Sequence, residues 1–246
     1  MNRLSACLFA LGLLVPGARA TTVIDWEDPS VIVTTINSRH VRVTGFTTGD
    51  HHLRFTVDIS TVNALLNVSF NPTGGENAPL NMNMPTPRNS LTLLTLTASL
   101  EGGVAMENIA YAILDIDGSP SLGNFRDWRD RVTITNAGAT LSAVNSNYVQ
   151  VTGLVATATG RNGNIGTTST NGNVNVSIPN PTATIGFLYG PGPGDRFNSN
   201  QLIAISKIRF TANPPPPTNT PEPVTWLSVG VVLCGLGWRA RRRGAS

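Results

Sequence analysis

The chain has 246 residues, with 17 basic and 14 acidic side chains and a formal net charge of +3. Six of the basic residues lie in the two ends, so residues 21–222 keep 11 basic against all 14 acidic side chains, a net charge of −3. This composition argues against nucleic-acid binding through a basic surface. Both cysteines, Cys7 and Cys234, also lie in the ends, so no disulfide can stabilise residues 21–222.

The N-terminus has the three parts of a secretory signal peptide. Arg3 supplies a positive charge, and residues 4–15 form an uncharged apolar run that a Pro-Gly pair ends. Ala18 and Ala20 then place small side chains at the two positions that a signal peptidase reads. The apolar run is too short to span a membrane as a helix. We therefore predict that residues 1–20 are a signal peptide and that the protein is exported.

Short segments of alternating apolar and polar residues follow, separated by clusters of Gly, Pro, Asn and Asp. This pattern is typical of β-sandwiches and jelly rolls. We predict an all-β fold class, with a single β-sandwich or jelly-roll-like domain over residues 21–212. Two polar stretches, residues 71–89 and 160–173, are predicted to be loops, where binding sites are common. The predicted strands are 22–26, 31–36, 40–46, 53–60, 64–70, 90–98, 109–116, 131–135, 148–158, 173–178, 182–189 and 202–210.

The last predicted strand resembles a strand of a known class of fold. Residues 200–210, NQLIAISKIRF, are similar to the closing strand of carbohydrate-binding jelly rolls. The resemblance implies pairing with a strand near the N-terminus, here the one that follows residues 25–29, DWEDP. Trp26, Trp128 and Tyr148 could form a platform on which sugars stack, or they could pack in the core.

Four aspartates form the richest acidic stretch, within residues 113–135. Asp115 and Asp117 are two residues apart and would face the same side of a strand. Asp127 and Asp130 follow after a loop. Because Ca²⁺ binds several converging oxygen ligands, these four residues are a candidate calcium site.

Two alternatives stay open for the same aspartates. Arg126, Arg129 and Arg131 lie between and beside them, so the stretch could be held by Asp–Arg ion pairs and turn capping. Two of the carboxylates could also act as the acid and base of a glycosidase. No other catalytic constellation is identifiable. We therefore predict that the protein is not an enzyme and that it holds no cofactor other than calcium.

The three histidines do not have the spacing of a metal site. His51 and His52 are neighbours and would point to opposite faces of a strand, whereas His40 is distant in sequence. A zinc site would need at least three ligands on one side, and no cysteine lies in residues 21–222. We predict that these histidines lie on surface turns.

The C-terminus combines a spacer, an apolar segment and a basic cluster. Residues 213–220 are a Pro-rich linker, which we expect to be stiff and extended. Residues 224–240 would be about 25 Å long as a helix, against a hydrocarbon core of about 30 Å. We predict a transmembrane helix whose basic flank stays on the cytoplasmic side, the alternative being a buried C-terminal helix. The stop residues are Arg239, Arg241, Arg242 and Arg243.

These elements, in this order, resemble the PEP-CTERM sorting signal of Gram-negative bacteria. The resemblance covers roughly residues 220–246, within a predicted sorting domain at residues 221–246, and its motif is Pro221, Glu222 and Pro223. It implies processing by an exosortase, a membrane-embedded cysteine transpeptidase that cuts near the motif. The protein would be anchored transiently in the inner membrane and then reach the outer surface or the extracellular matrix. The alternative is an uncut tail that remains as an anchor.

The sequence therefore predicts an exported protein of the cell envelope or extracellular matrix. Its role would be structural or adhesive and associated with exopolysaccharide, because the surface is rich in Thr and Asn and lacks a catalytic constellation. The alternative is an extracellular enzyme that acts on polysaccharide, or a carbohydrate-binding module. The predicted partners are the exosortase, the membrane and polysaccharide, with no nucleic acid among them.

Overall fold

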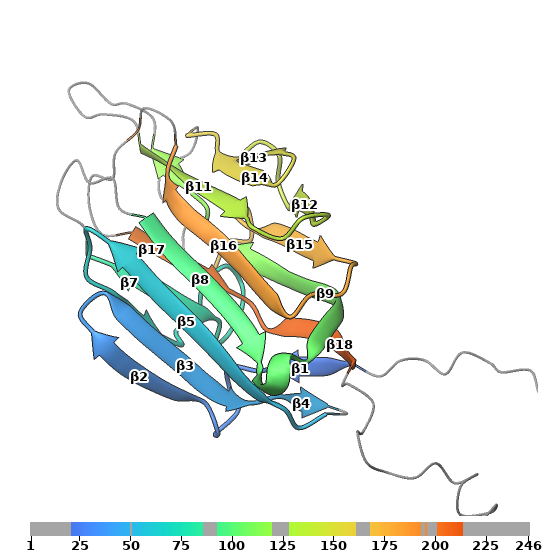
Figure 1. The fold of residues 1–246 in the computed structure, drawn as a ribbon. Coiled ribbons are helices and arrows are strands. Elements are labelled where there is room, and N and C mark those ends of the chain that lie inside the picture. The colour runs from blue at the N-terminus through green and yellow to red at the C-terminus, as the bar shows by residue number, and fades with distance from the viewer. Residues whose placement is uncertain are drawn as a thin grey trace, which may run out of the picture. The chain divides into compact units, whose positions relative to one another are not determined.

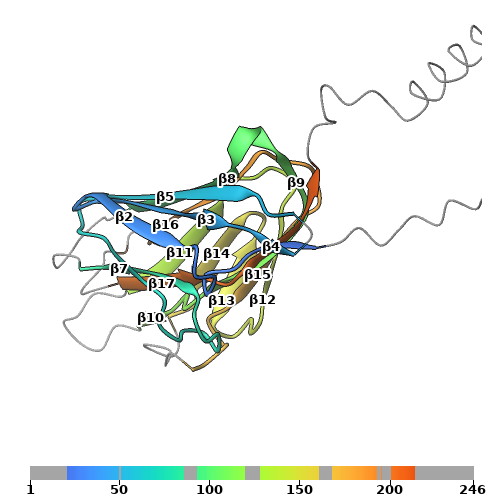
Figure 2. The ribbon, with the colours of Figure 1, turned by 90° about the horizontal axis from the view of Figure 1, so that it is seen from below.

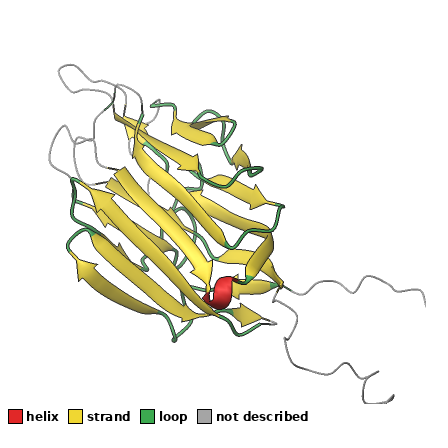
Figure 3. Cartoon of the chain, viewed as in Figure 1, coloured by secondary structure: helices red, strands yellow, loops and turns green. Residues whose placement is uncertain are grey.

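The protein is an all-β structure built from two antiparallel sheets of nine strands each (Figure 1). Seen from a second direction, the two sheets are curled and lie one over the other (Figure 2). One short 3-10 helix, η1 (Glu101–Gly103), joins two strands (Figure 3). The all-β prediction is confirmed. The computed structural model describes residues 21–49, 51–85, 93–119, 128–160, 168–192, 195 and 201–213.

Sheet A is organised around the long strand β9. One side of β9 pairs with β15, which pairs in turn with the edge strand β12. The other side of β9 is shared by β18 and β17. The main path of the sheet is β4 (Thr48–Gly49), β1 (Thr22–Ile24), β18 (Ile208–Asn213), β9 (Ala105–Leu114), β17 (Gln201–Ile205), β7 (Leu80–Met84) and β6 (Asn67–Ser69), with β15 (Val174–Ile178) and β12 (Thr140–Ala143) beside it.

Sheet B runs from β13 at one edge to β2 at the other. The short strand β10 (Gly118–Ser119) pairs with β11 outside this path. The path is β13 (Val149–Thr152), β14 (Val155–Ala158), β11 (Trp128–Ile134), β16 (Thr184–Pro191), β8 (Leu93–Leu100), β5 (Arg54–Val62), β3 (His40–Phe46) and β2 (Ile32–Asn37).

One hydrophobic core lies between the two sheets. On β5, Phe55, Val57 and Ile59 are completely buried and alternate with more exposed residues, as a strand with one core-facing side requires. Trp26 also lies in this core. Its indole N–H donates a hydrogen bond of 2.9 Å to the carbonyl of Ser206, and its ring meets Phe55 edge to face. Trp26 is therefore a packed core aromatic and not a sugar platform.

Two predicted strands are divided in the structure. The segment 148–158 is a hairpin of β13 and β14, and the segment 202–210 is split into β17 and β18. The second break has a clear cause at Ser206. Its hydroxyl accepts a hydrogen bond of 2.8 Å from the amide of Ala112, and its own amide donates to the Ala112 carbonyl. These bonds fix a local irregularity where a continuous strand was expected.

Two further predictions about strands were wrong. The segment 71–89 was predicted to be a loop, but it contains strand β7. The closing strand β18 was expected to pair with the strand that follows residues 25–29, but it pairs with β1, which precedes them. The segment around β7 looked like a loop because it is rich in Asn. Asn81 is nevertheless buried, because Thr73 donates a 2.6 Å hydrogen bond to its side-chain oxygen and its amide group donates to the Asn71 carbonyl.

The two ends of the chain lie outside the described residues. By its internal contacts the chain divides into two units, Met1–Asn213 and Pro214–Ser246, and every described residue belongs to the first. Within the described part, no helix has the length and hydrophobicity needed to cross a membrane. The predictions for the signal peptide, the sorting motif, the helix at 224–240 and the arginine cluster stay predictions.

Candidate functional site

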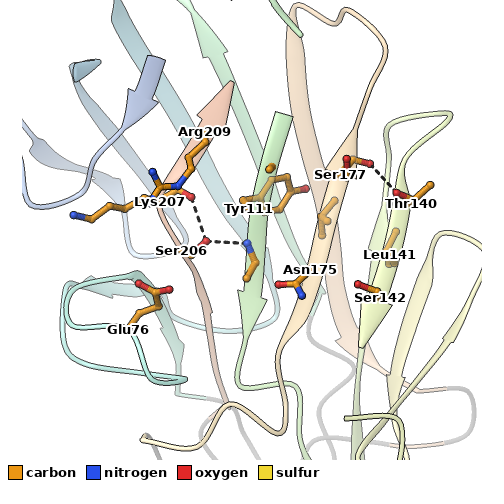
Figure 4. A pocket seen from close by; sticks show the side chains of 13 residues that line it. Glu76, Tyr111, Thr140, Leu141, Ser142, Asn175, Ser177, Ser206, Lys207 and Arg209 are labelled. Atoms are coloured by element: carbon orange, nitrogen blue, oxygen red, sulfur yellow. Dashed lines mark hydrogen bonds between the residues drawn. The ribbon is translucent and has the colours of Figure 1, made fainter. Parts of the chain in front are cut away.

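An open groove of about 460 Å³ lies on the outer face of sheet A (Figure 4). We call it the sheet A groove. It crosses β18, β9, β15 and β12, and a loop from the region before β7 reaches its rim through Glu76. Where the central strand β9 passes under the groove, its outward-facing residues are Ala110 and Ala112. Their small side chains leave room above the sheet, whereas the neighbouring strands carry longer polar side chains.

The strand registers arrange the groove residues in two rows across the sheet. In the first row, Arg209 lies opposite Ala110, Ala110 opposite Ser177, and Ser177 opposite Thr140. In the second row, Ala112 lies opposite Asn175, and Asn175 opposite Ser142. Since neighbouring strands are about 4.8 Å apart, a row across four strands is roughly 14 Å long. The rows therefore offer hydroxyl, amide and guanidinium groups to an extended ligand.

These polar groups are mostly available for a ligand. Within the part of the chain that the structure describes, the side chains of Ser142, Asn175 and Ser177 make no hydrogen bond. Thr140 makes only a long one, of 3.5 Å, to the carbonyl of Ser177. Arg209 likewise forms no ion pair with a described residue. An exposed hydroxyl or amide that bonds only to water can exchange that water for a ligand hydroxyl.

The second cation at the groove, Lys207, is already engaged. Its ammonium group lies 3.0 Å from a carboxylate oxygen of Asp25 and 2.5 Å from one of Glu27. Hydrogen bonds to Glu27 and then to Asp25 raise the pKa of Lys207 above its usual value. Arg209 is therefore the cation of the groove that remains open to an anionic ligand.

The loop at the groove rim is fixed to sheet A. Asn173 donates a 2.7 Å hydrogen bond to the carbonyl of Gly74. Gly74 has a positive φ of 60°, and a Cβ atom there would lie 2.8 Å from both the Leu114 Cβ and the Asn173 side-chain oxygen. Only glycine fits this approach without displacement. The rim that carries Glu76 is thus held against the sheet.

Three of the four predicted calcium ligands come together in the interior. Asp115, Asp117 and Asp130 are 8%, 6% and 0% exposed, and we call them the aspartate cluster. Asp130 accepts a 2.8 Å hydrogen bond from the Tyr189 hydroxyl and a 3.1 Å bond from the amide of Asp117. Asp115 adopts a left-handed backbone conformation with φ of 67°. It forms no hydrogen bond or ion pair with a described residue.

Burial changes the protonation of this cluster. It raises the pKa of Asp115 to about 7, and the neighbouring carboxylate of Asp117 contributes to the same shift. Burial also raises the pKa of Asp130 well above its usual value, again with the charge of Asp117 acting in the same direction. Removing a carboxylate from water disfavours its charged form, so the cluster favours bound protons.

The other expectations for the acidic stretch have mixed outcomes. Arg129 pairs with Asp195, at 3.0 Å and 3.3 Å, a partner that the sequence did not suggest. No group of three or more His, Cys, Asp or Glu residues within the described ranges could hold a metal ion. Asp127 and Arg126 lie outside those ranges, so the calcium site stays a prediction. For a glycosidase, Asp130 is poorly placed because it has no surface that a substrate could reach.

The histidines lie apart from both sites. The prediction of a surface turn was wrong for His40, which is the first residue of strand β3 and contacts Asp58 at 3.2 Å on the surface of sheet B. The ring of His52 stacks on Phe46. Tyr148 is partly buried against the core. The side chain of Trp128 is outside the described set. None of the individual residues singled out in the sequence lines the sheet A groove. The groove was missed because its residues come from strands that are distant along the chain.

Comparison with known proteins gives limited information. No protein-family model and no curated protein matches the sequence. Among solved structures, the adhesin domain of PrgB from Enterococcus faecalis bound to DNA is 15% identical, with a TM-score of 0.42 over 74% of this chain and 70% of that one. A second structure of that adhesin domain is 16% identical, with the same TM-score over 68% and 66% of the two chains. At this level of similarity, function has to be argued from the residues themselves.

The aspartate cluster predicts an unusual pH dependence of stability. The pKa of Asp115 rises from 3.8 when unfolded to about 7 when folded, so the folded state binds the extra proton between these values. Stability should therefore fall as the pH rises from 4 to 8, by at most about 4 kcal/mol from this group. We expect Asp115→Asn, which tolerates a positive φ, to be more stable than the wild type at pH 8 and little changed at pH 4. Urea denaturation at both pH values measures this.

A surface aspartate provides the control for this experiment. Partial burial raises the pKa of Asp58, but hydrogen bonds from Arg42 and His40 lower it overall. Asp58→Asn should therefore give no gain in stability at pH 8, and an equal gain in both variants would contradict the assignment to the cluster. Adding Ca²⁺ at pH 8 tests the calcium hypothesis separately. If the cluster binds calcium, Ca²⁺ should raise the Tm of the wild type but not that of Asp115→Asn. An unchanged wild-type Tm contradicts the calcium hypothesis.

Proposed function

We propose that this protein is exported to the cell surface or extracellular matrix and binds polysaccharide through the sheet A groove. The observation that carries the proposal is the pair of rows of small and polar side chains, one across four strands and the other across three. A sugar chain presents hydroxyl groups along its length, and the two rows offer matching donors and acceptors at strand spacing. The composition of the termini supports export.

The position of Arg209 at one end of the groove favours an acidic polysaccharide. Arg209 lies at one end of the first row without an ionic partner among the described residues. A guanidinium group can hold a carboxylate through two parallel hydrogen bonds, which an uncharged sugar cannot provide. We therefore propose that the ligand carries uronic acid or another carboxylate, with Arg209 as its anchor.

Binding fits this groove better than catalysis does. Hydrolysis of a glycosidic bond ordinarily requires two carboxyl groups on either side of the bond. Among the described residues that line the groove, Glu76 is the one carboxylic acid. The lining residues that the structure describes include no cysteine or histidine either, so they offer no nucleophile activated by a neighbouring histidine. A polysaccharide-acting enzyme stays the alternative.

Polysaccharide is also favoured over DNA. The similar adhesin domain is described as bound to DNA, but DNA binding draws on several basic side chains that neutralise phosphates. Residues 21–222 have a net charge of −3. Of the two cations at the groove, Lys207 is engaged with Asp25 and Glu27, which leaves Arg209 alone.

The C-terminal sequence supports a route to the surface. We propose that an exosortase recognises Pro221, Glu222 and Pro223 while the helix at 224–240 holds the chain in the inner membrane. The arginine cluster at 239–243 would prevent complete translocation. Cleavage near the motif would then release the β-sandwich outward.

Filling the sheet A groove should abolish binding. We expect Ala110→Trp to weaken binding to an acidic polysaccharide such as alginate at least tenfold, about 1.4 kcal/mol, because the indole would occupy the first row. The control is Thr95→Trp on the exposed face of sheet B, which should bind like the wild type. Affinity electrophoresis in gels that contain the polysaccharide measures both, and a glycan array extends the search to other acidic sugars.

The same assay separates the two parts of the proposal. Arg209→Ala should reduce binding to acidic polysaccharide while leaving any binding to neutral polysaccharide unchanged. Absence of binding across acidic and neutral sugars would remove the glycan proposal. Binding of duplex DNA that Ala110→Trp abolishes would instead assign the groove to DNA.

The sorting proposal predicts a defined mature C-terminus. In cells that produce an exosortase, we expect intact-mass spectrometry of the surface or released protein to find a chain that ends near residues 221–223. Glu222→Ala should leave the tail uncut and keep the protein in the inner-membrane fraction. A full-length tail on the wild-type surface protein would contradict cleavage and support permanent anchoring.

A further inference from the structure

Strand β2 is an exposed edge of sheet B (Figure 1). All six of its residues are exposed, including Ile32 at 60%, Val33 at 39% and Ile36 at 48%. Val33 lies opposite the fully buried Val43 of β3 and so faces the same side of the sheet. Its exposure means that the core ends at β3. Strand β2 therefore has apolar side chains on both faces and one side on which it pairs with no described strand.

The other strands at the ends of the sheets are shorter. Strands β4 and β6 have two and three residues, and β12 and β13 have four each, whereas β2 has six. Proteins usually protect an exposed edge with a charged residue, a proline, a β-bulge or a very short strand. The sequence of β2, IVTTIN, contains no charge and no proline, and its register shift lies at its end, between Thr35 and Asn37. An edge of this kind is a template for pairing with another strand.

We propose that β2 pairs antiparallel with β2 of a second copy of this chain, so that two sandwiches share one continuous sheet. A two-fold axis normal to the sheet keeps the core-facing sides of both copies on the same side. With Thr34 opposite Thr34 of the second copy, Val33 lies opposite the partner's Thr35, and Ile32 comes level with the partner's Ile36, where the register of β2 shifts. This register places Ile32 and Val33 of each copy beside the partner's strand.

The charges that flank β2 match this arrangement. Residues before the strand are acidic, including Asp28, and the turn after it carries Arg39. In the same register, the turn that carries Asp28 in each copy comes to the same end of the paired strands as the turn that carries the partner's Arg39. Arg39 forms no ion pair within the described part of its own chain. Antiparallel self-pairing thus brings an acidic turn and a basic turn to each end of the paired strands.

A charge placed at the two-fold axis tests the proposal. Thr34→Lys would put two ammonium groups opposite each other, so we expect the dimer to dissociate at least tenfold more readily. The matched control is Gln150→Lys on β13, the opposite edge of sheet B, whose side chain is also exposed. Sedimentation velocity of the full chain over a range of concentrations measures the dissociation constants. A monomer at every concentration for the wild type would overturn the proposal.

A disulfide tests the register directly. Cα atoms of directly opposite residues in an antiparallel pair are about 4.5–5.5 Å apart, within the range of about 4.4–6.8 Å that a disulfide spans. In the full chain with Cys7→Ser and Cys234→Ser, we expect Thr34→Cys to form a reducible dimer and Gln150→Cys to stay monomeric. Equal cross-linking of the two variants, or a complex of β2 with a different protein in place of the dimer, would overturn the proposed pairing. Neither outcome bears on the sheet A groove.

Discussion

The packing of inward-facing apolar side chains from both sheets into one core is the constraint on which the rest of the structure depends. Residues 21–222 contain no cysteine, so no disulfide can hold the sheets together. Long strands such as β5, β16 and β18 therefore place apolar residues in the core, among them Phe55, Phe187 and Phe210. The residues between them face outward and do not have to be apolar. The sheet A groove uses these outward positions.

Most strands could be predicted because they obey this alternation. The segment 40–46 is a strand over the same residues in the structure, and β5 and β15 lie close to their predicted positions. Prediction failed where tertiary contacts override local pattern. The buried Asn81 is stable inside the sheet because Thr73 and Asn71 satisfy its amide, and the break at Ser206 depends on its bonds to Ala112. The partners of Asn81 lie eight and ten residues away and that of Ser206 lies 94 residues away, so local sequence pattern does not reveal these bonds.

The candidate site was less predictable than the fold. Arg209 and Ala110 become neighbours through a strand register that a bulge after Arg209 shifts, and the sequence does not reveal such registers. Strand β12 has four residues, which are too few to show a clear alternation of apolar and polar residues. The burial of Asp130 could have been found, because the apolar Val132 and Ile134 alternate in the predicted strand 131–135 and the same period extends back to position 130. Asp195 lies in a Gly- and Pro-rich segment without periodicity.

The central claim is that one uninterrupted core, without any cross-link, holds both sheets and so positions their outer faces. Equilibrium unfolding of residues 21–213, followed by far-UV circular dichroism and by tryptophan fluorescence, tests it most directly, because Trp26 reports on the core and circular dichroism on all strands. The account predicts a single transition with the same midpoint by both probes. Two separate transitions, or midpoints that differ between the two probes, would contradict it.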